Sequence, residues 1–325
     1  MNFDLTEVQR TWRDKSAELG RSLSGDAAAA TVVAGAARAG LVDPAADFIA
    51  ATVATEALAA ESPAAGVIFA LHTAVALSVA GDDRFTGLFR GEAVAAVGLT
   101  SDDAPVDEGG GLSGRAPWVA PITDRGIAVV GSRDSAERVA YAVNFEAPGV
   151  EVEAAHTAGL GGVMCGHLTL KGVQSQPIGP TQPIMTRTRV LMAAAGLGIG
   201  RRALREALAT ARRAHRAAAG EQTVQGLLAD AATDLDAAML MTWKAAAADT
   251  LSLGSASLAK IMATAAAQRA VERATQVIGV DSFQRGHIIE RLARDVRALE
   301  LFAGRTEALR AAVAEELLPG SGTAG

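Results

Sequence analysis

Residues 276–317, QVIGVDSFQRGHIIERLARDVRALELFAGRTEALRAAVAEEL, show most clearly how this chain folds. After a break at Gly279, the apolar residues between 286 and 301 recur every three to four positions, which is typical of one face of an α-helix. The tetrapeptide FAGR at 302–305 interrupts that helix, and a shorter helical run follows to about Leu318. The stretch therefore predicts two helices joined by a tight corner.

The same helical period covers the residues that precede this stretch. Glycines separate several long runs, and short connections of that kind join antiparallel helices in a bundle. The predicted helices span 187–217, 221–249 and 254–279, and with 286–301 they form a C-terminal four-helix bundle over 187–325.

The rest of the chain divides into two parts. Residues 1–92 contain shorter helical segments, and Ser62-Pro63 places a capping residue before a Pro at a first helical position. Residues 93–186 read as short strands separated by Gly, Pro and Asp, as expected for an antiparallel barrel or sandwich. The fold class is therefore mostly α with a central β domain, in three domains at 1–92, 93–186 and 187–325.

The composition limits the kind of protein that this can be. Half of the 325 residues are apolar but only 4% are aromatic, so a large core must be built from Ala, Leu, Val and Ile. Abundant alanine favours closely packed helices, because alanine has a high helix propensity and a small side chain. The single cysteine, Cys165, excludes an internal disulfide, and the five histidines lack the spacing of metal ligands, so no metal is expected.

Several partners and locations are also disfavoured. There is no dense Lys/Arg block with interleaved aromatics, so we do not expect nucleic acid as a partner. The uncharged run 63–81 contains Pro, His, Thr and Ser and has acidic flanks, which favours a buried helix over a membrane span. The N-terminus lacks the apolar core of a signal peptide, which makes the cytoplasm the expected location.

Two motifs in the bundle have more than one interpretation. Gly196-Leu-Gly-Ile-Gly200 looks like a dinucleotide-binding loop, but a helical run rather than a strand precedes it, which argues against that site. Arg201 and Arg205 lie on one helical stripe together with Arg212 and Arg216. We expect this stripe to be a solvated face, or otherwise a surface for a phosphate or a partner.

Several phrases in the same order resemble the acyl-CoA dehydrogenase family. They begin with FDLTEVQ at 3–9, LFRGEAVAAVGLT at 88–100 and LSGRAPWVAP at 112–121, continue through the stretch from APGVEVEAAHT to HLTLKGVQSQP and GEQTVQGLLADAATDLDAA at 220–238, and end with RLARDVRALELFAGRTEALRAAVAEEL. Each phrase is weak alone, but their number and order cover nearly the whole chain.

The resemblance implies a particular fold and chemistry. It implies N-terminal helices, a middle β-barrel and a C-terminal four-helix bundle, packed into dimers or tetramers with FAD at a subunit interface. It also implies oxidation of an acyl-CoA thioester at Cα–Cβ, with a glutamate that removes the α-proton. Such a base must lie beside a polarised thioester carbonyl in a site that excludes water.

Neither of the family's base positions carries a carboxylate in this sequence. The family's glutamate after the last bundle helix corresponds to Ala303, and the alternative position on the first bundle helix corresponds to Thr188. Glu300 or, less directly, Glu307 could act as a substitute, although a surface helix glutamate is the simpler interpretation of Glu300.

The resemblance also assigns binding residues. For FAD it implies Thr100, Trp118, Gln276 and Gly279, although two glycines of the family's loop are replaced by Val280 and Ser282. Arg189 and Gly304 match positions beside the acyl-CoA substrate. Four of them have a plainer interpretation: a core residue for Trp118, a polar residue at a strand end for Thr100, a helix C-cap for Gly279, and a surface or structural ion pair for Arg189.

These losses lead to one main hypothesis and two alternatives. The main hypothesis is a subunit without the catalytic glutamate, which completes the flavin and CoA site of a homologous subunit in fatty acid or steroid catabolism. The resemblance associates heteromers of this kind with bulky substrates such as steroid side-chain thioesters. The first alternative is an active acyl-CoA dehydrogenase, self-associated as a dimer or tetramer, with a relocated base. The second is a non-redox protein on the same fold.

Overall fold

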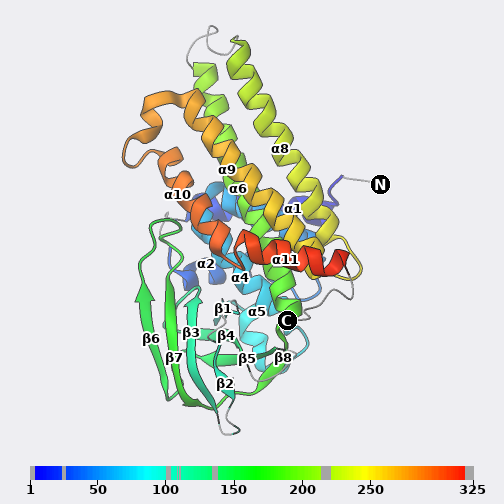
Figure 1. The fold of residues 1–325 in the computed structure, drawn as a ribbon, viewed down its shortest axis with the longest axis vertical. Coiled ribbons are helices and arrows are strands. Elements are labelled where there is room, and N and C mark those ends of the chain that lie inside the picture. Colours follow the sequence, from blue (N-terminus) through cyan, green and yellow to red (C-terminus); the bar gives the residue numbers. More distant parts are fainter. Residues whose placement is uncertain are drawn as a thin grey trace.

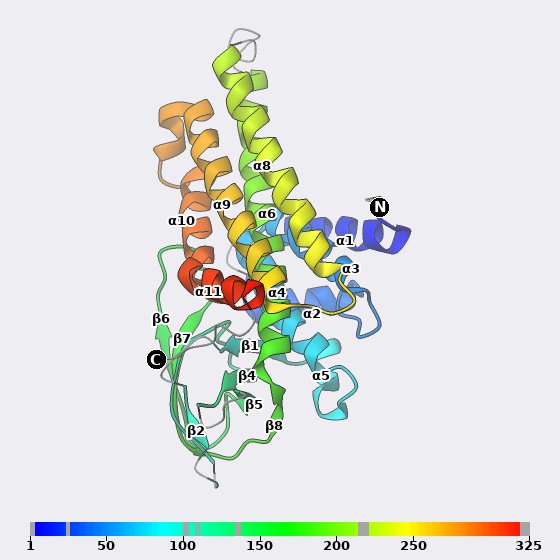
Figure 2. The same cartoon turned by 45° about the vertical axis from the view of Figure 1, so that its right-hand side comes forward.

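The computed structural model describes residues 4–23, 27–99, 104–107, 109, 111–133, 138–213 and 221–318. The molecule is elongated, with long helices at one end and the β-strands at the other (Figure 1). The N-terminal helices lie beside the lower half of the long helices and above the strands (Figure 2). The observed fold class is thus mostly α with a central β domain, as the sequence predicts.

The N-terminal part contains five helices and one short 3-10 turn within the described residues. They are α1 (Glu7–Ser22), α2 (Ala29–Arg38), α3 (Phe48–Glu61), α4 (Pro63–Ser78), η1 (Asp83–Phe85) and α5 (Thr86–Phe89). Helix α4 begins with Pro63 at its first turn, as expected, and its residues are buried from Pro63 to Ala76. Among the described residues, no helix is both long and apolar enough to span a membrane.

His72 connects α4 to the β domain. Its Nε2 lies 3.1 Å from the carbonyl oxygen of Leu88, and its Nδ1 accepts a 3.1 Å hydrogen bond from the Ala95 amide. These two bonds define a neutral ring with the proton on Nε2. Burial lowers the pKa of His72 to about 4, so the ring stays neutral and structural.

In the described part of the chain, the β domain contains two four-stranded sheets. One has the order β1 (Val94–Gly98), β4 (Gly126–Gly131), β5 (Val139–Asn144), β8 (Pro177–Pro180); the other has the order β2 (Val106–Asp107), β3 (Leu112–Val119), β7 (Cys165–Val173), β6 (Val150–Ala155). Val130 and Val143 of the first sheet and Leu168 and Leu170 of the second belong to one buried cluster. The two sheets therefore pack face to face around a shared core.

One strand pair differs from the antiparallel arrangement expected from the sequence. Strands β1 and β4 run parallel, with Val94 opposite Gly126 and Gly98 opposite Val130. The order of the strands explains the parallel pairing. After β1 the chain forms β2 and β3 of the other sheet, and it then returns to the first sheet, where β4 pairs with β1. Such a long crossover permits parallel pairing, which a hairpin does not.

The C-terminal part is a bundle of long helices with one helix across its end. It contains α6 (Thr181–Arg213), α8 (Gln222–Ala246), α9 (Leu253–Ile278), η2 (Gly279–Phe283), α10 (Ile288–Leu301) and α11 (Thr306–Leu317). Helix α6 begins six residues before the position 187 that the sequence indicated. Pro183 does not prevent this start, because it lies in the first turn, where its backbone N–H is not needed.

Glycines and alanines allow α6 to pack closely against its neighbours. A Cβ at Gly198 would lie 2.3 Å from the Glu56 carbonyl oxygen of α3, and one at Gly200 would lie 2.5 Å from a methyl group of Leu235 in α8. The glycine motif of α6 therefore serves helix packing, in agreement with the argument against a dinucleotide site. The buried face of α9 consists largely of alanine, as the composition predicts.

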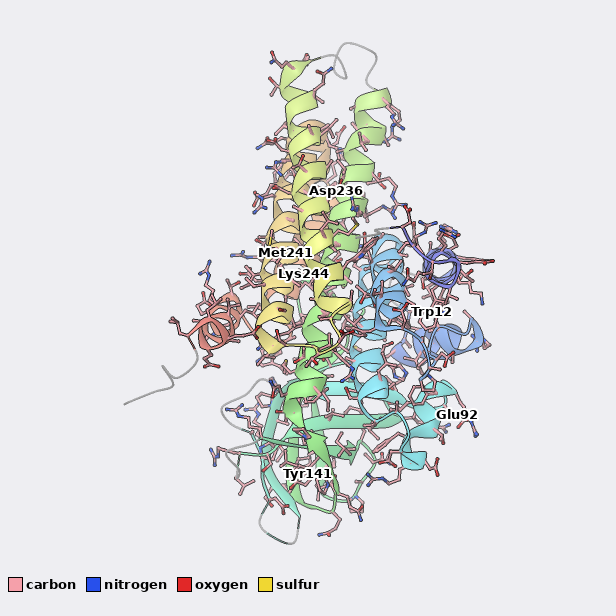
Figure 3. The ribbon with its side chains drawn as sticks, turned by 90° about the vertical axis from the view of Figure 1, so that its right-hand side faces the viewer. Trp12, Glu92, Tyr141, Asp236, Met241 and Lys244 are labelled. Carbon is pink, nitrogen blue, oxygen red and sulfur yellow. The ribbon has the colours of Figure 1, made fainter. Side chains whose placement is uncertain are left out.

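The arginine stripe of α6 is exposed at Arg205 and Arg212, as expected for a solvated face, and Arg201 is half-buried. Arg201 pairs with Glu56 of α3 at 3.5 Å and with Asp236 of α8 at 2.7 Å; Figure 3 labels Asp236 on α8. Arg205 pairs with Glu61 at 2.8 Å. These ion pairs tie α6 to α3 and α8. Arg216 lies outside the described residues.

Candidate functional site

The corner between α10 and α11 has an unusual backbone. Ala303 has φ 56° and Gly304 has φ 104°, both in the left-handed region. A non-glycine residue adopts this region rarely, and both residues are buried. The corner must therefore be held by its surroundings.

Two buried cations hold this corner. The Arg189 guanidinium of α6 donates to the Ala303 carbonyl oxygen at 3.2 Å and to the Ser257 hydroxyl of α9 at 2.7 Å. The Lys260 ammonium of α9 donates to the carbonyl oxygens of Glu300 at 3.0 Å and Gly304 at 2.8 Å. Three carbonyl groups at the end of α10 thus accept hydrogen bonds from two neighbouring helices, where cations also stabilise the helix dipole.

Burial dominates the electrostatics of this corner. Lys260 is only 1% exposed, and burial lowers its pKa to about 7. The nearby charge of Arg189 lowers that pKa further, while Glu300 acts in the opposite direction. Burial also lowers the pKa of Arg189. Arg189 is therefore a structural donor to the corner rather than a surface ion pair.

Neither predicted base position holds a group that can accept a proton from carbon. Ala303 presents a methyl group. Thr188 is fully buried, and its hydroxyl donates to the Ile184 carbonyl oxygen at 2.7 Å. Neither position therefore carries a carboxylate.

Glu300 has a different role from that of a free base. Its carboxylate accepts hydrogen bonds from Arg297 at 2.9 Å, Gln268 at 3.0 Å and Thr306 at 3.2 Å. These donors come from α9, α10 and the start of α11. Glu300 therefore joins the three helices around the corner, and Glu307 lies exposed in the first turn of α11.

Trp118 lies on the β domain and is 59% exposed, which excludes a core role. It has φ 56° and lies at an irregularity of β3, where the register with β7 shifts between Ala116 and Val119. An exposed indole held in this conformation offers a flat aromatic surface. Thr100, the other predicted flavin contact of this domain, lies outside the described residues.

Gln276 and Gly279 lie at the opposite end of α9 from the corner. Gln276 is exposed and follows Lys260 by sixteen residues, which places the two about 24 Å apart along the helix. Gly279 is the C-cap of α9 with φ 78°, and Val280 and Phe283 after it are 82% and 74% exposed. The chain thus brings Arg189, Ala303 and Gly304 together but does not bring Gln276 and Gly279 to them.

Three residues of this region were not predicted from the sequence. Lys260 and Ser257 lie on the buried alanine face of α9, and Asp295 lies on the buried face of α10. The Asp295 carboxylate accepts a 2.6 Å hydrogen bond from the Leu160 amide, which fixes the loop between β6 and β7 against α10. A charged residue in phase with a buried helical face is the signal that could have identified Lys260 and Asp295.

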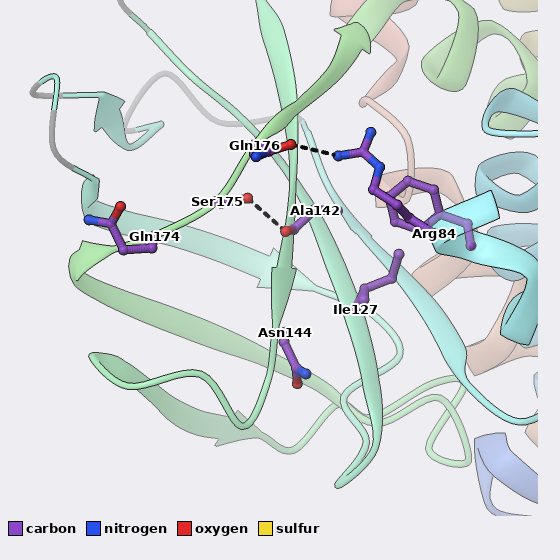
Figure 4. A pocket seen from close by; sticks show the side chains of 8 residues that line it. Arg84, Ile127, Ala142, Asn144, Gln174, Ser175 and Gln176 are labelled. Atoms are coloured by element: carbon purple, nitrogen blue, oxygen red, sulfur yellow. Dashed lines mark hydrogen bonds between the residues drawn. The ribbon is translucent and has the colours of Figure 1, made fainter. Parts of the chain in front are cut away.

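A hollow lies away from the corner, between η1 and the outer face of the first sheet. Its volume is about 530 Å³ (Figure 4). Arg84 donates to Gln176 at 3.1 Å, and the Ser175 hydroxyl donates to the Ala142 carbonyl oxygen at 2.7 Å. Arg84 also pairs with Asp82 at 2.6 Å, so its charge is balanced within the chain. Of the residues predicted for the site, those that the structure describes do not line this hollow.

Comparison with known proteins shows which family and which solved structures this chain resembles. Residues 181–318 match the family described as acyl-CoA dehydrogenase, C-terminal domain. A 3-sulfinopropanoyl-CoA desulfinase of Paraburkholderia xenovorans is 38% identical over 135 residues, which are 40% of this chain and 35% of the relative. The matched stretch thus spans about a third of the length of that relative.

Two solved structures extend the likeness in fold to nearly the whole chain. Butyryl-CoA dehydrogenase from Megasphaera elsdenii superposes with a TM-score of 0.86 at 16% identity, over 98% of this chain and 100% of that one. A glutaryl-CoA dehydrogenase from Mycobacterium smegmatis in complex with FADH2 gives 0.86 at 14% identity, over 99% and 96%. Residues 181–318 therefore match the C-terminal domain of the acyl-CoA dehydrogenase family, and the chain as a whole has the same fold as these two dehydrogenases.

Proposed function

We propose that this chain is a subunit of an acyl-CoA dehydrogenase-type flavoprotein, in which it supplies binding surfaces but no catalytic base. The homologous partner subunit then carries the glutamate that removes the α-proton of an acyl-CoA thioester. The observation that carries the proposal is the corner at Ala303 and Gly304, which is held by two buried cations although neither base position has a carboxylate.

The substitute base is the weaker alternative. Three hydrogen-bond donors surround the Glu300 carboxylate, so abstraction of a proton by this group would first require the loss of contacts to α9 and α11. Those contacts explain the residue without a catalytic role. Arg189 and Gly304 remain our proposed residues on the substrate side of the corner.

The flavin ring fits the β domain better than the loop after α9. Trp118 offers an exposed aromatic face for the ring. The loop after α9 retains one left-handed glycine, Gly279, and its exposed Val280 and Phe283 are suited to an apolar surface rather than to a phosphate. When bound, FAD accepts the hydride that desaturation of an acyl-CoA releases.

The spacing within α9 favours a site shared between subunits. Because about 24 Å of helix separates Gln276 from the corner, one chain does not surround a flavin with both groups of residues. A second subunit would bring its own corner, or its own Gln276 position, to complete the site. We therefore propose FAD at the interface with a homologous subunit.

The proposal is tested by comparing the purified chain with its complex. We expect the chain alone to show negligible acyl-CoA oxidation, and the complex with a homologous glutamate-bearing subunit to be active. Steady oxidation by the chain alone at the rate of the complex would overturn the proposal.

The Ala303→Glu variant distinguishes a chain that lacks only the catalytic base from a chain that also lacks flavin-binding residues. Because Ala303 already has φ 56°, the longer side chain adds little backbone strain. If the complex of Ala303→Glu with a base-deleted partner regains activity while Ala303→Gln does not, then the base alone is missing from this chain. If neither regains activity, the flavin-binding residues of this chain are also incomplete.

A further inference from the structure

The bulge of β3 leaves one backbone donor without a partner in the sheet. Between the pairs Ala116–Leu168 and Val119–Gly166, β3 has two residues, Pro117 and Trp118, whereas β7 has only His167. Two residues opposite one is the pattern of a β-bulge. Proline has no N–H, so the Trp118 N–H is the donor that the bulge must satisfy.

The His167 side chain provides the missing acceptor. The Trp118 N–H donates to His167 Nδ1 at 3.3 Å. The two rings also meet edge to face, with 5.0 Å between their centroids and 71° between their planes. One side chain therefore satisfies the backbone of Trp118 and supports its indole.

Hydrogen bonds within the sheets hold the residues that follow Trp118, so a change of conformation in this part of β3 would occur at the bulge. Val119 pairs with Gly166 of β7, and Ala120 exchanges backbone hydrogen bonds with Val97 of β1 at 2.8 and 3.2 Å. A bulky residue with positive φ is strained and persists only where its contacts hold it. His167 makes both of the contacts described above.

We propose that His167 is a positioning residue whose ring holds Trp118 in its outward conformation, and that loss of this ring's acceptor releases Trp118 and weakens binding of the flavin ring. A side chain without an acceptor at this position leaves the Trp118 N–H without its partner. The effect on flavin rests on the proposed function, whereas the effect on Trp118 does not.

Charged groups on the neighbouring strands face His167. Glu153 of β6 is directly opposite it, and Arg115 of β3 lies on the same face and pairs with Glu153 at 3.5 Å. Lys171 on β7 itself pairs with Glu151 of β6. Both carboxylates thus have cationic partners, and the ring itself is only partly buried. These groups are exposed, and salt would screen their influence on the ring.

Tryptophan emission of the chain without FAD tests the positioning role. The signal of Trp118 is obtained by subtracting the emission of Trp118→Phe, which leaves Trp12 and Trp243 in place. His167→Leu removes the acceptor and the edge-to-face ring contact, so we expect it to shift the Trp118 emission. His167→Asn keeps an acceptor at the Nδ1 position and should keep the Trp118 emission close to that of the wild-type chain.

An exposed histidine at the end of β6 supplies the matched control. His156→Leu should keep the wild-type Trp118 emission. Wild-type emission from His167→Leu would overturn the positioning role, and so would an emission from His167→Asn that is shifted as far as that of His167→Leu. His167→Ala, which also lacks an acceptor, repeats the test if His167→Leu fails to fold.

FAD titration of the same proteins tests the second part of the proposal, the effect of His167 on flavin binding. Loss of one aromatic contact predicts affinity about two- to tenfold weaker for His167→Leu, and an affinity near that of the wild-type chain for His167→Asn. If the emission behaves as expected but His167→Leu binds FAD as tightly as the wild-type chain, the flavin part of the proposal is wrong and the positioning role stands. If neither the chain nor its complex binds FAD, the proposed function fails instead.

Discussion

Replacement of Lys260 by methionine tests how the corner between α10 and α11 is held. The substitution keeps most of the side-chain volume but removes the donor to two carbonyl groups, at 3.0 and 2.8 Å. A buried carbonyl without a partner costs about 1–3 kcal/mol, so the two together cost about 2–6 kcal/mol. Removal of a desolvated amine offsets part of this loss, which leaves a net destabilisation of about 2–4 kcal/mol above neutral pH.

The pH dependence makes this prediction specific to Lys260. Its pKa is about 7 in the folded protein and near 10.5 in the unfolded chain, so between these values the unfolded chain binds more protons. The stability that Lys260 contributes therefore rises with pH across this window, by at most about 1.4 kcal/mol per pH unit, and is lost as pH falls toward 7. The neutral amine retains two N–H bonds, one for each carbonyl.

Urea unfolding measures the difference directly. From about pH 7 to about pH 8.5, the stability gap between the wild-type chain and Lys260→Met should widen by about 2 kcal/mol. Lys244→Met, at an exposed position of α8 (Figure 3), is the matched control and should show a gap near zero at both pH values. A gap for Lys260→Met that stays constant or narrows as pH rises would refute this explanation of the corner.

Three further changes test the packing around the site. His72→Ala should lower the unfolding free energy by about 2–5 kcal/mol at pH 7, because two buried backbone groups lose their partner. The difference in stability between the wild-type chain and this variant should shrink as pH falls from 6.5 toward 4, where wild-type His72 itself becomes protonated. Urea unfolding at pH 7 and near pH 4 checks both expectations. Gly198→Ala should destabilise by about 1–3 kcal/mol because its Cβ meets the carbonyl oxygen of Glu56, whereas Gly226→Ala, with open space around it, should stabilise by about 0.5–1 kcal/mol; equal effects in thermal unfolding would contradict the packing argument. Asp295→Ala should free the β6–β7 loop, so limited proteolysis should cut near residue 160 faster than in wild type, and an unchanged cleavage pattern would contradict this.

Local periodicity was enough to predict the helices of the bundle and the corner after α10. The apolar spacing before residue 302 and the glycine at 304 indicate a helix and its end within one short stretch, so no distant contact is needed. The absence of a carboxylate at Ala303 and Thr188 was also visible, because both lie within phrases that resemble the family. These features depend on residues close together in the chain.

Features that depend on distant neighbours could not be predicted in this way. Lys260 is a lone cation in an alanine-rich helix, and its role depends on carbonyl groups about forty residues further along the chain. The bulge at Trp118 depends on the register of β3 against β7, and the parallel pairing of β1 with β4 depends on a crossover through the other sheet. Register and crossover are properties of the assembled sheet rather than of any one strand.

The most direct measurement is the rate of acyl-CoA oxidation, with an artificial electron acceptor, by this chain alone and in complex with a homologous subunit that carries the glutamate. We predict negligible turnover by the chain alone and clear turnover by the complex, lost when the partner's glutamate is replaced by glutamine and kept when Glu300 of this chain is replaced by glutamine. Turnover by the chain alone that is lost in Glu300→Gln would contradict the proposal and identify Glu300 as the base.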